Sequence, residues 1–131
     1  EEGTWTPSFE ANGQSGSYTY TSQVGSYTKI GNMVYGSFKI IWTGIASVGA
    51  ATRIVGLPFS WNATYDAFGA TPTYISGVPH TDGLYLPMTS TGGGGKTAFN
   101  LYSDGSTQVN TTTGNNLSSS GTLYGTFMYQ V

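Results

Sequence analysis

Few side chains in this sequence could take part in acid–base chemistry. His80 is the only histidine, and Asp82 follows it two positions later. Such a pair could serve a serine nucleophile as a base and its orienting carboxylate. The sequence has no Gly-x-Ser-x-Gly turn of the kind that exposes such a serine. A loop histidine is therefore the preferred interpretation, and no catalytic residue is predicted.

Carboxylates could also supply the acid and base that cleave a sugar bond. The candidates are Glu10, Asp66, Asp82 and Asp104. Asp82 and Asp104 each precede a glycine, and aspartate in such turns accepts backbone hydrogen bonds. We therefore expect no enzyme, and a glycan hydrolase fragment is the less favoured alternative.

Phosphate, metal and nucleic-acid sites are not predicted either. Gly95-Lys96-Thr97 matches the end of a phosphate-binding loop, but Ser90 stands where its first glycine is required. No closely spaced group of His, Asp and Glu suggests a metal ion, and no cofactor is implied. With four basic residues, six acidic residues and a net charge of −2, the chain has too few cations for nucleic acid. No apolar run approaches the roughly 20 residues of a membrane-spanning helix, so no membrane insertion is expected.

A surface of aromatic and polar side chains is the remaining candidate site. A sugar is bound by a flat ring against its C–H face and by planar polar groups at its hydroxyls. Both kinds of side chain alternate in one loop-rich segment. The predicted glycan-binding residues are Trp61, Asn62, Tyr65, Asp66, Tyr74, His80, Asp82 and Tyr85. For Trp61 and Tyr65 the alternative that the ring fills the core or a subunit interface stays open, and for Phe68 that alternative is preferred.

These residues must be positioned by β-strands. The 131 residues form one domain, with 20 Gly, 10 Tyr, no Cys and only 8% charged residues. From Met33 to Trp42, apolar residues alternate with the others, as in a half-buried strand. Gly31-Asn32 tolerates the positive φ of a tight turn. The pattern predicts a hairpin of Ser26–Ile30 and Met33–Trp42, with Ser17–Ser22 as a strand leading into it.

Several further short strands complete an all-β fold, for which a jelly-roll-like antiparallel β-sandwich is predicted. They are expected at Thr52–Gly56, Ala63–Phe68, Thr73–Ser76, Leu84–Met88, Thr97–Tyr102, Thr107–Thr111 and Gly121–Val131. Pro7 is compatible only with an edge or a non-strand stretch. The predicted core consists of Val34, Phe38, Ile40, Trp42, Ile54, Leu57, Phe127 and Tyr129.

Four segments in this order resemble the C-terminal domains of tailed-phage tail fibres and tailspikes. They are Gly3–Pro7 (GTWTP), Tyr20–Asn32 (YTSQVGSYTKIGN), Arg53–Phe59 (RIVGLPF) and Gly121–Tyr129 (GTLYGTFMY). The resemblance implies a jelly-roll tip module that forms a homotrimer, assists fibre assembly and, in some fibres, touches glycans of the host surface. It also implies an extracellular location at the fibre tip of the virion. Because the sequence begins Glu1-Glu2-Gly3 without methionine, we expect it to be a piece excised from a longer protein.

The expected function is therefore a receptor-binding module that contacts a host cell-surface glycan. The alternative is a purely structural tip for trimerisation and folding, without a ligand. In a trimer, apolar side chains such as Met33, Tyr35 or Ile41 are expected to meet near the three-fold axis.

Overall fold

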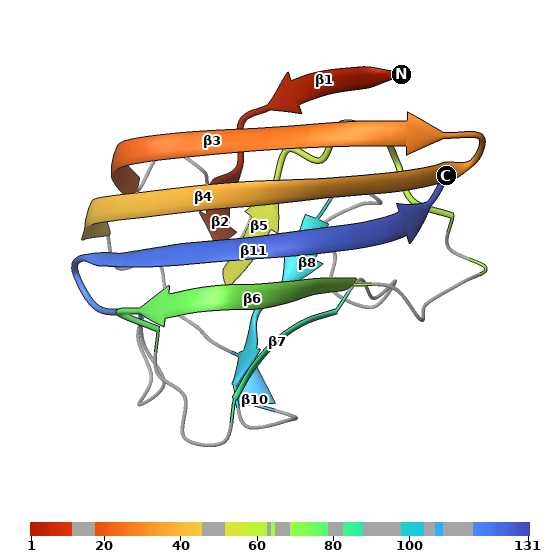
Figure 1. Ribbon diagram of the computed structural model, residues 1–131. Coiled ribbons are helices and arrows are strands. Elements are labelled where there is room, and N and C mark those ends of the chain that lie inside the picture. The colour runs from red at the N-terminus through yellow and green to blue at the C-terminus, as the bar shows by residue number, and fades with distance from the viewer. Residues whose placement is uncertain are drawn as a thin grey trace.

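The computed structural model describes residues 1–11, 18–45, 52–62, 64, 69–78, 83–87, 98–103, 107–108 and 117–131. All the helix-or-strand structure within these residues is β-strand, and every strand pair is antiparallel. The strands form two sheets that pack against each other (Figure 1). The predicted all-β fold of two packed antiparallel sheets is confirmed. None of the described residues forms a helix that is long and apolar enough to cross a membrane.

The two sheets differ in size. In spatial order the large sheet contains β1 (Glu2–Trp5), β3 (Tyr18–Ile30), β4 (Met33–Ile45), β11 (Gly121–Gln130), β6 (Gly69–Ser76), β7 (Leu84–Pro87), β9 (Tyr102–Ser103) and β10 (Thr107–Gln108). The small sheet contains β2 (Ser8–Ala11), β5 (Thr52–Val55) and β8 (Ala98–Asn100). Figure 1 shows the small sheet lying behind β4, β11 and β6.

The hairpin of β3 and β4 forms as the sequence predicts. Gly31 has a φ of 60°, and the two-residue turn pairs Ile30 with Met33. The separate strand predicted at residues 17–22 is wrong, because β3 runs without interruption from Tyr18 to Ile30. Its pairing with β4 shifts register on both sides of Tyr20. Such irregularities bend a strand without ending it.

β11, the last strand, lies in the middle of the large sheet between β4 and β6. Leu123, Gly125, Phe127 and Tyr129 share its buried face, and Phe127 and Tyr129 are among the predicted core residues. Gly125 is required there because a Cβ atom would lie 2.6 Å from the Phe38 ring and 2.9 Å from the Thr71 carbonyl oxygen. The centre of the sheet is thus built by residues that are distant in sequence.

The other strands agree with the sequence in part. β5, β6, β7 and β10 overlap their predicted ranges, although β6 begins earlier, at Gly69. The single strand predicted over residues 97–102 is instead two, because β8 pairs with β5 in the small sheet and β9 pairs with β7 in the large sheet. Of the strand predicted over residues 63–68, the described residue is Thr64, which lies in a turn.

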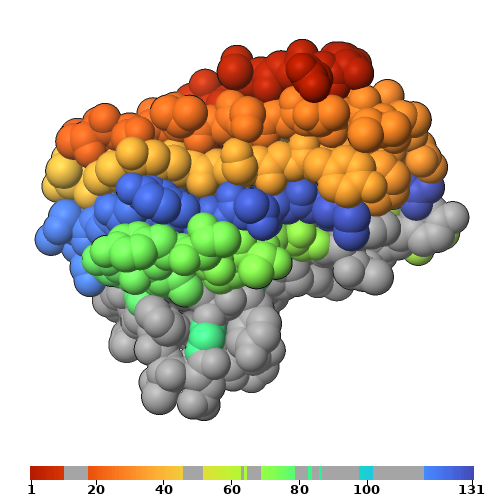
Figure 2. Space-filling view, viewed as in Figure 1, coloured from red at the N-terminus to blue at the C-terminus, as the bar shows by residue number. Residues whose placement is uncertain are grey.

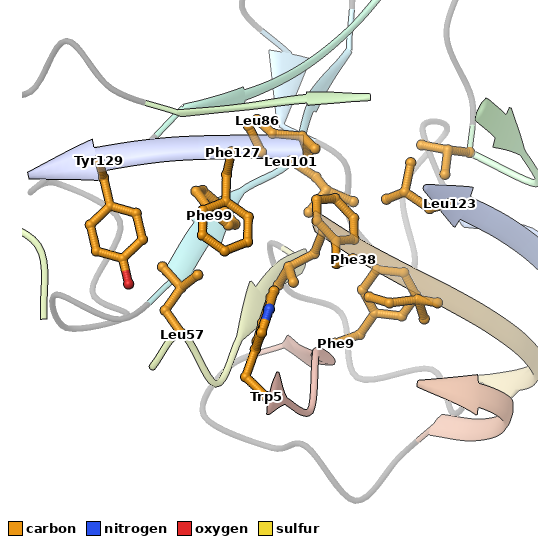
Figure 3. Close-up of a cluster of buried hydrophobic side chains, with 14 of the residues drawn as sticks. Trp5, Phe9, Phe38, Leu57, Leu86, Phe99, Leu101, Leu123, Phe127 and Tyr129 are labelled. Atoms are coloured by element: carbon orange, nitrogen blue, oxygen red, sulfur yellow. The ribbon is translucent and has the colours of Figure 1, made fainter. Parts of the chain in front are cut away.

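The core between the sheets is aromatic. Phe9 of the small sheet meets Trp42 edge-on at 5.1 Å between ring centroids, and Phe99 lies 5.5 Å from Phe127. Trp5 packs its ring edge-on against Phe127. Figure 3 shows the rings of Trp5, Phe9, Phe99 and Phe127 in this core. Edge-on and tilted contacts of this kind stabilise aromatic cores beyond the area they bury. All the predicted core residues are buried.

Candidate functional site

The predicted site at residues 61–85 does not come together in the described residues. Trp61 is 3% exposed and belongs to the core, which is the alternative that the sequence left open. The Asn62 N–H donates to the Gln130 carbonyl at 2.7 Å, and the Asn62 side chain accepts from the Thr64 N–H at 3.0 Å. The contact with the end of β11 fixes this segment against the core. The ring of Trp61 therefore cannot serve as a sugar platform.

Most of the other predicted residues fall outside the described part of the chain. This holds for Tyr65, Asp66, His80 and Asp82. Tyr85 lies in β7, where its backbone is paired with Tyr102. Tyr74 is the member of the set that the structure places on an open surface, because it lies in β6 with 55% of its side chain exposed.

Tyr74 points to the outer face of the large sheet, which is the face turned away from the core. Figure 2 views the molecule from this side. All the exposed large hydrophobic side chains among the described residues lie on this face: Val24, Ile30, Tyr35, Tyr74 and Met128. Met33, Tyr35, Ser37, Lys39 and Ile41 of β4 face outward as the alternation predicts. Exposed apolar side chains that gather on one face of a protein can mark a binding site.

Strand pairing arranges the outer face in rows that cross the strands. One row is made of short hydroxyl side chains at partner positions on β1, β3, β4, β11 and β6. Its members are Thr4, Ser26, Ser37, Thr126 and Thr71. The hydroxyl oxygens of Ser26 and Ser37 lie 3.0 Å apart, within hydrogen-bond distance. This row is a straight floor of groups that can both donate and accept hydrogen bonds.

Longer side chains form a row on each side of this floor. One wall consists of Val24, Lys39, Tyr124 and Tyr74, and the other of Glu2, Thr28, Tyr35 and Met128. We call the floor and its two walls the hydroxyl trough. A hollow of about 450 Å³ lies on the Tyr124 side of the floor, and one of about 400 Å³ lies on the Tyr35 side. Ser26 and Ser37 line both hollows, so this pair lies where the two hollows meet.

The wall with Tyr124 carries an aromatic pair and a cation. The rings of Tyr74 and Tyr124 lie 5.5 Å apart and are tilted by 37°. The Lys39 ammonium lies 5.3 Å from the centroid of the Tyr124 ring, within the range of a cation–π contact. The trough therefore offers ring faces, hydroxyls and one ammonium, and this combination suits a polar ligand with C–H surfaces.

Metal ligands and carboxylates are the other candidate groups for chemistry. No group of three or more His, Asp or Glu side chains among them could hold a metal ion. Of the carboxylates considered for sugar cleavage, the structure describes Glu10, and this residue forms an ion pair with Arg53 at 2.7 Å on the small sheet. Glu10 thus has a structural partner and lies on the other sheet from the trough.

Two tyrosine hydroxyls have structural roles at the core. The Tyr20 hydroxyl accepts from the Phe9 N–H at 2.7 Å. The Tyr129 hydroxyl accepts from the Phe59 N–H at 3.3 Å and donates to the Phe59 carbonyl at 3.1 Å. Burial raises the pKa of both Tyr20 and Tyr129 to about 12, although each backbone N–H opposes this shift. These hydroxyls are therefore neutral at ordinary pH. Tyr20 connects β3 to β2, and Tyr129 connects β11 to the segment that follows β5.

Sequence reasoning missed the hydroxyl trough, although part of the signal was present. A two-residue turn at Gly31-Asn32 already implies that Ser26 pairs with Ser37 and Val24 with Lys39. The contribution of Tyr124 and Thr126 depends on β11 joining the sheet between β4 and β6, which no local pattern reveals. Comparison of the chain with protein-family models, curated proteins and solved structures gives no match.

Proposed function

We propose that this chain is the tip module of a tailed-phage tail fibre or tailspike, and that it attaches to a host cell-surface glycan through the hydroxyl trough. The four segments that resemble such tips support the first part. They supply much of β1 and β5, most of β3 and β11 and the turn after β3, which are scaffold elements of the two sheets. The trough supports the second part and is the observation on which the proposal depends.

The chemistry of the trough suits a sugar. Serine and threonine hydroxyls can donate to and accept from sugar hydroxyls, and five of them stand at partner positions on five neighbouring strands. The rings of Tyr35, Tyr74 and Tyr124 border the floor, and tyrosine gives large contact area at a small cost in side-chain entropy. Because long paired strands carry these groups, the site needs little ordering when it binds.

The proposal includes a homotrimer with jelly-roll topology, as the resemblance implies. Three copies of one chain would present three troughs, and attachment to a glycan-covered surface would then gain from avidity even if each site bound weakly. The location that follows is the extracellular tip of the virion's fibre.

A purely structural tip is the second candidate, and exposed apolar side chains favour it. Ile30 is 67% exposed and Met128 is 43% exposed, and both lie with Met33 and Tyr35 toward the turn of the β3–β4 hairpin. A neighbouring copy could cover this end of the outer face. Self-association there would leave the Tyr124 side of the trough open, so the two functions are compatible.

A glycan array with the isolated chain tests the proposal. We expect Tyr74→Ala combined with Tyr124→Ala to abolish glycan binding and leave the melting temperature and the mass in solution nearly unchanged. Thr122→Val is the control, because Thr122 lies on the same strand and face as Tyr124, lines neither hollow and is far along the strand from the hairpin turn. Binding that survives the double change would contradict this site.

Light scattering separates the two candidates further. A homotrimer has three times the 13.8 kDa mass of the chain, and we expect this mass at micromolar concentration. A trimer that binds no glycan on the array would favour the purely structural tip. A mass near 13.8 kDa would contradict trimerisation by this chain alone.

A further inference from the structure

We propose that the hollow beside Lys39 binds the carboxylate of an acidic sugar, so that the ligand of the trough is an anionic oligosaccharide. This inference rests on the proposed function and names its ligand class. Its starting point is the position of one ammonium group in an otherwise uncharged part of the surface.

The Lys39 ammonium is positioned by an aromatic ring and has no carboxylate partner among the residues that the structure describes. Its ammonium lies 5.3 Å from the centroid of the Tyr124 ring, which draws the side chain along the wall of the trough. Among the residues that the structure describes, the one ion pair joins Arg53 to Glu10 on the small sheet. No carboxylate in that part of the chain therefore neutralises Lys39.

The outer face carries a positive side chain on one side of the floor and a negative side chain on the other. Lys29 is turned the other way, with its ammonium 5.6 Å from the centroid of the Phe59 ring, so Lys39 is the side-chain cation that the described outer face carries. Glu2 lines the hollow on the opposite side of the floor. A carboxylate would be drawn toward Lys39 and repelled from Glu2, and this difference fixes the orientation of an acidic ligand across the trough.

The neighbouring hydroxyls complete a site for a singly charged group. Ser26, Ser37 and Thr126 line the same hollow as Lys39. One hydroxyl of the Ser26–Ser37 pair donates to the other. The remaining serine hydroxyl, the Thr126 hydroxyl and the ammonium can still donate to the two oxygens of a carboxylate. A doubly charged phosphate is usually met by arginine or by several cations, and the described part of this hollow offers one lysine.

The size of the effect follows from one partly exposed charge pair. Such a pair and its charge-assisted hydrogen bonds correspond to about a 5- to 10-fold change in affinity. We therefore expect an acidic oligosaccharide to bind about 5- to 10-fold more tightly than the same oligosaccharide with its carboxylate reduced to an alcohol. Because one charge contact is involved, the affinity for the acidic form should fall modestly with salt, and that for the reduced form should not.

The experiment uses oligosaccharides of glucuronic, galacturonic and sialic acid, each beside its carboxyl-reduced counterpart. The expected result is a preference for at least one acidic form that Lys39→Gln abolishes and Lys39→Arg retains in part. Glu2→Gln is the control, because it removes a charge from the other hollow and should keep or strengthen the preference.

The outcomes distinguish this inference from the function on which it rests. Equal binding of an acidic glycan and its reduced form, insensitive to Lys39→Gln, would overturn the inference and leave glycan attachment standing. Failure of every glycan to bind would overturn both. A change in oligomeric mass on Lys39→Gln would show that a second copy occupies the hollow, and this result would also overturn the inference.

Discussion

The inner and outer faces of the large sheet are made by the same strands, yet their side chains differ in kind. In β4, Phe38 is almost fully buried, while its neighbours Ser37 and Lys39 line the trough. In β11, Phe127 is buried beside the exposed Thr126 and Met128. The inner face is a packed aromatic layer, and the outer face is a row of hydroxyls between rings.

The difference between the faces shows how a chain with few charges separates stability from binding. Successive side chains of a strand point to opposite faces, so a residue that folds the protein can stand next to one that binds. Substitutions on the inner face are expected to lower the stability of the fold, because its rings interdigitate with the small sheet. Substitutions on the outer face are expected to leave the stability of the fold nearly unchanged and to alter ligand binding.

Phe127→Ala should produce the largest effect, because it removes a ring that contacts Trp5, Phe99 and Tyr129. Loss of a buried phenylalanine costs about 3–5 kcal/mol of unfolding free energy, enough to prevent folding in a marginal domain. Met128→Ala, next in sequence but on the outer face, should change stability far less. Urea unfolding of both variants tests the comparison, and equal midpoints would contradict the assignment of faces.

Sequence reasoning succeeded where structure is decided locally. The alternation from Val34 to Trp42 and the turn at Gly31-Asn32 specify a strand, its buried face and its partner within a few residues. The buried face of β11 follows in the same way from Leu123, Phe127 and Tyr129. These patterns depend on the period of a strand, which does not require knowledge of distant contacts.

The surroundings of Trp61 and Tyr74 could not be predicted from local sequence, because they depend on contacts between distant segments. Trp61 stands in a segment without periodicity, and it is drawn into the core beside the end of β11, where Asn62 bonds to Gln130. Tyr74 meets Tyr124 only because β6 pairs with β11. The floor of the trough consists of small hydroxyl residues, which are common on any outward sheet face and carry no distinct signal in sequence.

Alkaline pH should lower the free energy of unfolding through Tyr20 and Tyr129, whose hydroxyls make hydrogen bonds at the core. Burial raises the pKa of both to about 12, whereas a tyrosine in the unfolded chain has a pKa of about 10. Their contribution to stability is complete below pH 10. It is lost as pH rises from about 10 to 12, because the unfolded chain then releases protons that the folded chain retains.

Melting temperatures measured across this pH range test the effect. Tyr129→Phe should lower stability at neutral pH, because its hydrogen bonds with Phe59 are lost. The same change should reduce the further loss between pH 10 and 12. If the melting temperature of Tyr129→Phe falls between pH 10 and 12 as much as that of the unchanged chain, Tyr129 does not contribute to the loss of stability.

The smallest change in stability is expected for Thr126→Val, which tests the floor of the trough. Valine keeps the β-branched shape that suits a strand, so the free energy of unfolding should change by no more than about 0.5 kcal/mol. The substitution removes a hydroxyl that lines the hollow beside Lys39. Loss of one hydrogen bond to a sugar should weaken glycan binding about 5-fold.

Thr122→Val is the matched control for this prediction. Thr122 lies on the same strand and the same face, but it pairs with Ile41 and Ser76 and lines neither hollow. Binding measured by calorimetry should therefore fall for Thr126→Val and stay unchanged for Thr122→Val. If both variants lose affinity equally, the outer face acts through its general polarity. If neither variant loses affinity, the ligand does not reach the hydroxyl row, because a sugar bound there would lose its contact with the Thr126 hydroxyl.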